Sequence, residues 1–274
     1  DAAHRQIFRS GKWNDWASLV LANLYAGMSY GWWQHKHSRH HAKPNQVGAD
    51  PDIATGALVF HTQDLEKPRS GFAGWFVQRQ GWLFFPLLLL EGLNLHVSGL
   101  RTILGKGAVK RRWVELAFVT LRLGGYLALV FWVLPIGMGF AFLGVQLGLF
   151  GVYMGAVFAP NHKGMPIVPP DSRIDFFRRQ VLMSRNVSGG RLTTFFMGGL
   201  NYQVEHHLFP SMPSPNLRKI QPMVRSFCAT HSVPYTETTL IQSYGIVIRF
   251  LNETGLAARD PFQCPLTAEY RSAR

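Results

Sequence analysis

The amino-acid sequence predicts an all-α integral membrane protein, with a transmembrane helical hairpin, interfacial amphipathic helices and a helical cytoplasmic cap. Three observations predict this class. Two adjacent apolar stretches are each long enough to cross a bilayer, Lys and Arg gather on either side of them, and histidines cluster with helical spacing before and after the pair. The 274 residues are 47% hydrophobic yet carry 28 Lys and Arg against 15 Asp and Glu, which is typical of a membrane protein with large cytoplasmic parts.

The hairpin consists of residues 113–135 and 136–159. A membrane-spanning helix needs about 20 mostly apolar residues, and both stretches reach that length. The second stretch has no charged residue. The first contains Glu115 and Arg122, which are costly in hydrocarbon and are therefore expected to face protein or the interface. The junction at residues 135–139 is short and uncharged, which predicts a tight turn on the far side of the membrane.

The cations on either side of the hairpin predict its orientation. Five closely precede it and five closely follow it, so by the positive-inside rule both of its ends are cytoplasmic. These residues are Arg101, Lys106, Lys110, Arg111, Arg112, Lys163, Arg173, Arg178, Arg179 and Arg185. Residues 160–274 are then predicted to form a cytoplasmic cap.

Two other apolar stretches, residues 17–33 and 81–98, are interrupted by polar groups. If either crossed the membrane once, the histidines before and after it would lie on opposite faces. We therefore expect both to be interfacial amphipathic or re-entrant helices rather than spans.

Two histidine clusters share one spacing. One has the pattern H-x-x-H-H and the other Q-x-x-H-H, and residues three and four apart lie on one face of a helix. The clusters are His37, His40 and His41, and Gln203, His206 and His207. Neutral imidazole is the commonest nitrogen ligand of metals and suits Zn, Cu, Fe and Ni.

Two single histidines, His4 and His162, extend this set. The two crossings of the hairpin return the chain to the same face of the membrane, so both clusters can share one centre. Together they supply too many ligands for one tetrahedral zinc and suit two metals. The histidines outside the clusters, His35, His61, His96 and His231, are expected to be surface or packed core residues.

The formal net charge of +13 limits the kinds of partner. It suits anionic lipid headgroups, an acidic electron-donor protein or a phosphorylated substrate. No recognition motif for nucleic acid accompanies the charge, and the basic residues flank apolar segments, so we exclude nucleic acid as a partner.

With these motifs the chain resembles the membrane-bound fatty acid desaturase family, which carries three histidine boxes. The second box runs on into AKPNQVGADPDI, and the third lies in GGLNYQVEHHLFPSMP with Gln in place of its first His. Both features are similar to the front-end and linoleoyl-CoA-desaturase-like branch. The opening DAAHRQIF resembles a first box whose leading His is missing, and His162 in PNHKG matches an additional ligand of the family.

The resemblance implies one desaturase domain over residues 1–274, divided into a box I and II region (1–112), the hairpin (113–159) and the cap with box III (160–274). It implies a four-span fold, two of whose helices would precede Asp1. It implies a centre of two non-haem irons that uses O₂ as co-substrate. The expected iron ligands are His4, His37, His40, His41, His162, His206 and His207.

The resemblance also implies partners and a location. The substrate is expected to be a fatty acyl-CoA or acyl-lipid, and the electron donor a cytochrome b5, a ferredoxin or a flavin reductase. Membrane lipid surrounds the protein, and the site is expected on the cytoplasmic face of a bacterial inner membrane or of the endoplasmic reticulum.

Supporting residues are predicted from their place in the sequence. Metal-bound imidazoles need an acceptor for their other N–H, and the candidates near the boxes are Gln203, Asn201 and Asp52, with Asp1, Asp50 and Glu205 as further ones. Three cations follow a helix start at residues 214–215 and are candidate contacts for a substrate headgroup. These are Arg218, Lys219 and Arg225.

Two alternatives stay open from the residues alone. A lipid hydroxylase or ketolase would use the same di-iron scaffold with a different outcome. A non-catalytic, His-rich, metal-binding membrane protein is disfavoured because residues 136–159 have no ionisable group along a transport path.

Overall fold

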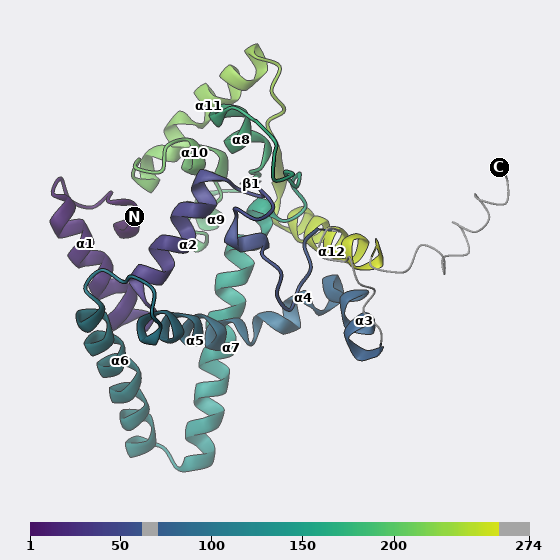
Figure 1. The fold of residues 1–274 in the computed structure, drawn as a ribbon. Coiled ribbons are helices and arrows are strands. Elements are labelled where there is room, and N and C mark those ends of the chain that lie inside the picture. Colours follow the sequence, from purple (N-terminus) through teal and green to yellow (C-terminus); the bar gives the residue numbers. More distant parts are fainter. Residues whose placement is uncertain (62–70, 258–274) are drawn as a thin grey trace.

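A computed structural model of the chain describes residues 1–61 and 71–257. Within these residues the chain is mostly helical, with one small sheet (Figure 1). An apolar hairpin of two long helices projects from a body of shorter ones. The expected all-α membrane fold is confirmed.

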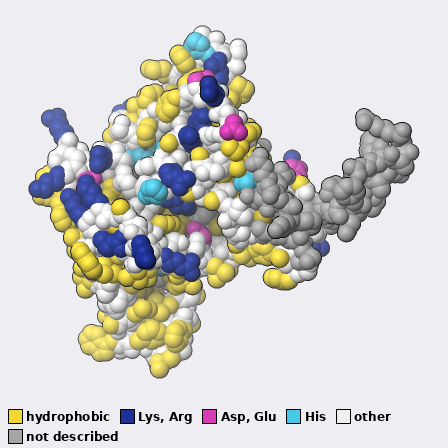
Figure 2. Space-filling model, in the orientation of Figure 1, with side chains coloured by type: hydrophobic (Ala, Val, Ile, Leu, Met, Phe, Trp, Pro, Cys, Tyr) yellow, Lys and Arg dark blue, Asp and Glu magenta, His cyan; other side chains and the backbone are white. Residues whose placement is uncertain are grey.

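The hairpin consists of α6 (Arg112–Val133) and α7 (Ile136–His162), joined by two residues. Both helices are long and apolar enough to cross a membrane, and only 11% of each apolar window is buried. Figure 2 shows hydrophobic side chains over the projecting hairpin and Lys and Arg over the part of the molecule above it. This distribution is the one expected for a hairpin in lipid whose cations lie at the membrane surface.

Glu115 on α6 faces protein, as the sequence predicts for a charge within a span. Its side chain is fully buried. One carboxylate oxygen accepts hydrogen bonds from Asn23 Nδ2 at 3.2 Å and Ser29 Oγ at 2.6 Å, and the other accepts from the backbone N–H of Gly31 at 3.0 Å. Glu115 therefore ties the membrane hairpin to the segment that leads into the second histidine box.

That segment is broken rather than one continuous helix. It comprises α1 (Gly11–Leu19), a π-helical turn η2 (Val20–Tyr25) and α2 (Tyr30–Ala42). Gly27 takes a positive φ of 72° at the break, and Ser29 then caps α2 by accepting a hydrogen bond from Trp32 N. The break interrupts residues 17–33, and this stretch is not among the candidate membrane spans of the described residues.

The second interrupted stretch is bent. It comprises α4 (Gln80–Leu88) and α5 (Glu91–Leu104), which meet at 73° and form either a broken span or a re-entrant loop. α5 and α4 approach α7 closely through glycines: a Cβ at Gly151 would lie 2.1 Å from the carbonyl oxygen of Leu88. The expectation that residues 81–98 are an interfacial or re-entrant helix rather than a span stays a prediction, because the bend fits a re-entrant loop and a broken span equally. The short helices α3 (Gly71–Val77) and η3 (Pro51–Ile53) flank this region.

The cap follows α7. Its helices are α8 (Phe176–Leu182), α9 (Arg191–Phe196), α10 (Gln203–Leu208), α11 (Ser214–Thr230) and α12 (Leu240–Ala257). Two short strands, β1 (Asn186–Ser188) and β2 (Glu237–Thr239), pair in parallel. A small apolar core of Val181, Val204, Val224 and Cys228 joins α8, α10 and α11. The end of the predicted cap, residues 258–274, lies outside the described residues.

Candidate metal centre

Seven histidines from four elements meet where the cap covers the top of α7. The elements are η1 (Ala2–His4), α2, the last residue of α7, and α10. Their ring nitrogens form two groups, and within each group the candidate ligand atoms lie within 4.8 Å of one another. The groups are His4, His37, His41 and His206, and His40, His162 and His207.

In the first group the Nε2 atoms face one another. His37 Nε2 lies 2.9 Å from His4 Nε2 and 3.0 Å from His41 Nε2. The ring of His206 is 4.6 Å from that of His4 and 4.8 Å from that of His41, centroid to centroid. Trp33 stacks on His37 with ring centroids 4.2 Å apart. Four imidazole nitrogens thus converge on one small space with an aromatic wall.

The second group is more deeply buried. His40 Nε2 lies 3.2 Å from His162 Nε2, and the ring of His207 is 4.6 Å from that of His162. Gln203 contributes its amide, whose nitrogen lies 2.8 Å from His162 Nε2. Three imidazoles and one amide therefore surround this space.

Helix geometry explains why each box serves both groups. On α2, His37 and His41 are four residues apart and lie on one line along the helix, whereas His40 points to the neighbouring group. On α10, the adjacent residues His206 and His207 diverge, one to each group. The sequence predicted that each box points into one shared centre. In the structure each box instead contributes histidines to two adjacent but distinct groups.

Three acceptors orient the rings of the second group from behind. Asp50 Oδ2 accepts from His40 Nδ1 at 2.9 Å, and the backbone carbonyl of Met183 accepts from His162 Nδ1 at 2.9 Å. The side chain of Gln180 accepts from His207 Nδ1, also at 2.9 Å. With Nδ1 protonated and held, each Nε2 presents its lone pair to the shared space, which is the arrangement of metal-ligating histidines.

Burial keeps most of these rings neutral. It lowers the pKa of His4 to about 4 and holds the pKa values of His37, His206 and His207 well below 6.5. His40 differs: burial lowers its pKa, but the hydrogen bond to Asp50 and the nearby carboxylates outweigh burial and raise it. Neutral imidazole is the form that binds metal.

Two buried side chains that the sequence did not single out hold the site together. Gln180 is fully buried, and its amide nitrogen donates to the carbonyl oxygen of His41 at 3.0 Å, so it connects the second box to the third. Arg185, predicted only as a cytoplasmic cation, is buried, and burial lowers its pKa to about 10. Its guanidinium donates to the carbonyls of Pro160 and Lys163, which caps α7 where His162 sits.

The predicted supporting residues have different surroundings. Asp52 lies 3.4 Å from His40 Nδ1 and 2.8 Å from Lys36 Nζ, so it is beside the site. Asn201 donates to Thr194 Oγ1 at 3.2 Å, and Glu205 accepts from Asn186 and Tyr235.

The three predicted headgroup cations lie on α11. Arg218 and Lys219 are exposed, and Lys219 Nζ donates to Asn216 Oδ1 at 3.0 Å. Arg225 forms an ion pair with Glu237.

The histidines outside the boxes do not join the two groups within the described residues. His96 Nδ1 hydrogen-bonds the carbonyl of Gly27 at 2.9 Å, and His231 packs against Phe227. His35 lies next to the second box but lines a neighbouring pocket instead.

The donor set fits metal ions. Ring nitrogens face one another at hydrogen-bond distance in both groups, and His207 Nε2 is buried without a hydrogen-bond partner in the described part of the chain. An unpaired buried nitrogen is costly unless something binds it. All-imidazole sites suit iron, zinc, copper or nickel rather than magnesium or calcium.

Comparison with known proteins identifies a family to which the chain is similar. The family model described as "Fatty acid desaturase" matches residues 1–239. The chain is 30% identical over 272 residues to an acyl-lipid (9-3)-desaturase of Borago officinalis, covering 95% of this chain and 60% of the relative. An acyl-lipid (9-3)-desaturase of Physcomitrium patens is 30% identical over 267 residues, with 95% and 50% covered. A Delta(8)-fatty-acid desaturase of Helianthus annuus is 26% identical over 282 residues, with 95% and 59% covered. The chain thus spans half to three-fifths of the length of these relatives.

Proposed function

Because the chain belongs to the fatty acid desaturase family, we propose that it forms the catalytic part of an enzyme that uses O₂ to place a double bond in a fatty acyl chain. The acyl chain would be carried on a lipid or on coenzyme A. The names of two relatives, both acyl-lipid desaturases, favour the lipid.

The observation that supports this proposal is the pairing of two histidine groups side by side beneath the cap. Seven imidazoles exceed what one metal ion needs, so two ions are proposed. Removing hydrogen from an unactivated methylene requires an oxidant that no side chain supplies. Two irons bound to these histidines would supply it by activating O₂.

The protein's own residues would prepare the site for this chemistry. Asp50, Gln180 and the carbonyl of Met183 hold three rings in the orientation that directs Nε2 inward. Burial keeps the imidazoles of His37 and His206 unprotonated at neutral pH. The cap covers the second group, which limits the access of bulk water to it.

We also propose the cytoplasmic face as the location of the site. Cations before α6 and after α7 support this orientation, because both ends of the hairpin carry them. An electron-donor protein, whether a cytochrome b5, a ferredoxin or a flavin reductase, would then approach from the same side. The host membrane would be a bacterial inner membrane or the endoplasmic reticulum.

The test is the fatty acid profile of a host that expresses the complete reading frame together with an electron donor. Gas chromatography with mass spectrometry would locate any new double bond. A His206→Ala/His207→Ala variant removes one histidine from each group, and His231→Ala, an exposed cap histidine, is the matched control.

A new unsaturated species that is absent only in the double variant would support desaturation and give its position. A hydroxylated product would instead support the hydroxylase alternative. A profile identical in all strains, with the protein present and loaded with iron, would refute the proposed reaction.

A further inference from the structure

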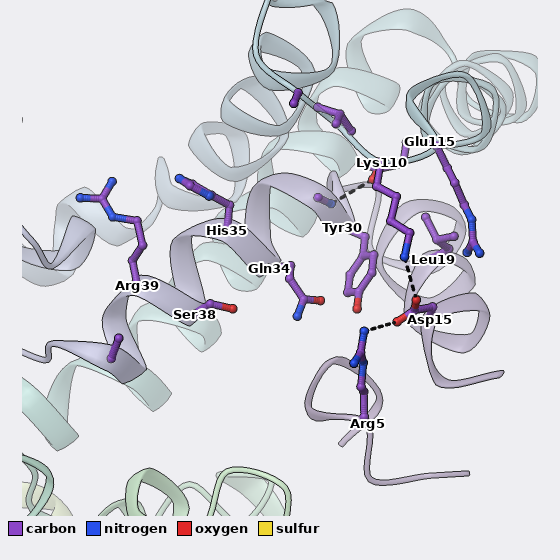
Figure 3. A pocket seen from close by; sticks show the side chains of 15 residues that line it. Arg5, Asp15, Leu19, Tyr30, Gln34, His35, Ser38, Arg39, Lys110 and Glu115 are labelled. Carbon is purple, nitrogen blue, oxygen red and sulfur yellow. Dashed lines mark hydrogen bonds and ion pairs between the residues drawn. The ribbon is translucent and has the colours of Figure 1, made fainter. Parts of the chain in front are cut away.

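A pocket of about 530 Å³ lies between α1, α2 and the start of α6, beside the histidine groups (Figure 3). Its volume falls in the range of about 300–1,000 Å³ that small-ligand sites occupy. Figure 3 shows Arg5 and Lys110 reaching Asp15 from opposite sides, with Tyr30 and Gln34 beside them. The proposed function assigns no role to this pocket.

The pocket carries a surplus of positive charge. Arg5, Arg39, Lys110 and Arg111 line it, whereas Asp15 and Glu115 are the only acidic residues among the described ones that do so. Both carboxylates already have partners within the protein. Asp15 is shared by Arg5 Nη2 at 3.2 Å and Lys110 Nζ at 3.3 Å, and Glu115 is fully buried and accepts three hydrogen bonds.

Two of these arginines have a strained backbone. Arg5 has a φ of 59° and Arg111 a φ of 60°, and only two other non-glycine residues of the described chain have a positive φ. The left-handed region is disfavoured for residues with a long side chain, and such strain concentrates at ligand-binding sites. The folded structure therefore places two guanidiniums at this pocket against a local conformational cost.

The position of the pocket at the start of α6 also points to its ligand. Lys110 and Arg111 directly precede α6, so with the hairpin in a bilayer the pocket would lie where the span leaves the hydrocarbon and the lipid phosphates begin. Arg111 additionally packs over the ring of Trp16 at 4.7 Å, an aromatic residue of the kind found at that interface.

The pocket adjoins the histidine site. A second pocket of about 380 Å³ shares Arg5, Gln34 and Ser38 with it and is lined by His4, His37 and His41 of the first group. A ligand anchored in the cationic pocket could therefore extend along α2 to the edge of the first histidine group.

We propose that this cationic pocket binds the phosphate of the acyl carrier and so positions the acyl chain against the first histidine group. The inference rests on the proposed function for the identity of the chain, but not for phosphate binding itself. The phosphate could belong to a phospholipid headgroup or to coenzyme A. Both offer oxygens that arginine and lysine bind through charge-assisted hydrogen bonds.

The experiment measures binding without turnover. Isothermal titration calorimetry of the purified, detergent-solubilised protein would use two probes, coenzyme A and the short-chain phospholipid dihexanoylphosphatidic acid. The test variant is Lys110→Glu, with Lys110→Ala as the milder second variant if the first is unstable. Lys106→Glu is the matched control, because it makes the same charge change four residues earlier and outside the pocket. Arg218→Glu tests the cations of α11.

We expect Lys110→Glu to weaken binding of at least one probe by about tenfold or more, and Lys106→Glu and Arg218→Glu to change it by less than about twofold. The probe affected would identify the source of the phosphate. An equal loss in Lys106→Glu, no loss in Lys110→Glu, or a loss confined to Arg218→Glu would overturn the assignment.

The failure of one proposal can be distinguished from the failure of the other. Phosphate binding through Lys110 in a protein that forms no double bond would refute the proposed desaturation but not phosphate binding in the cationic pocket. Desaturation by a Lys110→Glu variant with unchanged phosphate binding and unchanged KM would refute phosphate binding in the pocket but not the proposed desaturation.

Discussion

Gln180 is the side chain that connects the two histidine boxes directly, and its replacement by leucine gives a sharp prediction. Its amide oxygen accepts from His207 Nδ1 at 2.9 Å, and its amide nitrogen donates to the carbonyl of His41 at 3.0 Å. Leucine has a similar volume and can do neither. The Gln180→Leu variant therefore tests whether this bridge orients the third box.

The expected magnitude follows from the two bonds. Gln180 is fully buried, so each abandoned partner stays away from water and costs about 1–3 kcal/mol. The free energy of unfolding should fall by about 2–6 kcal/mol in total. Loss of the acceptor behind a metal-ligating histidine typically weakens metal affinity by about 10–100-fold, and the same range is expected for one of the two proposed iron sites.

The assay is a Fe(II) titration of the purified protein under anaerobic conditions, combined with its thermal unfolding in detergent. Gln180→Glu is the informative second variant, because it keeps the acceptor for His207 but opposes the carbonyl of His41. Gln242→Leu is the matched control, since Gln242 is exposed on α12 and its partner is the backbone of Thr239.

The reasoning would be refuted if Gln180→Leu bound two Fe(II) with the affinity of the unaltered protein. A loss of stability with unchanged iron affinity would show that Gln180 only supports packing. Weakened binding in Gln242→Leu as well would show that the effect does not arise at the bridge.

Three further predictions concern the same framework. Asp50→Asn should weaken Fe(II) binding by about 10–100-fold in the same titration, because the carboxylate no longer orients His40, and unchanged affinity would contradict that role. Glu115→Ala should lower the unfolding midpoint, at a cost of about 3 kcal/mol or more, because three donors lose their acceptor; an unaltered midpoint would be the opposing result. Burial lowers the pKa of His4 to about 4 and that of the other histidines of its group below 6.5, so the unfolded chain binds protons that the folded chain does not. The free energy of unfolding of the metal-free protein should therefore fall as pH falls from about 6.5 toward 4, by up to about 1.4 kcal/mol per pH unit for each such histidine, and equal urea midpoints at pH 7 and pH 5 would contradict this.

Local signals in the sequence were sufficient for much of the site. The spacing of His37, His40 and His41 places them on neighbouring positions of one helix, and the same holds for His206 and His207. Two crossings return both boxes to one face. Each of these inferences depends on residues that are close in sequence or on a count of spans.

The supporting contacts could not be predicted in the same way. Gln180 is 27 residues from His207 and 139 from His41, and no local pattern distinguishes it from an ordinary polar residue of a short helix. Arg185 was used only as one of the cations that orient the hairpin, yet its side chain is buried and caps the end of α7. The candidates chosen by proximity to the boxes differ in their contacts. Asp52 lies beside His40, whereas Asn201 donates to Thr194 and not to a histidine.

By itself, the sequence determined the membrane hairpin, the histidine set and the family, because hydrophobic length and residue spacing are properties of the linear chain. Only the tertiary structure decided how the seven histidines divide between two groups, which acceptors lie behind them, and that a cationic pocket adjoins them. The division and the acceptors depend on the relative placement of η1, α2, α7, α8 and α10, and the pocket depends on that of α1, α2 and α6. That placement is set by the packing of elements up to about 200 residues apart, for which no short-range pattern exists.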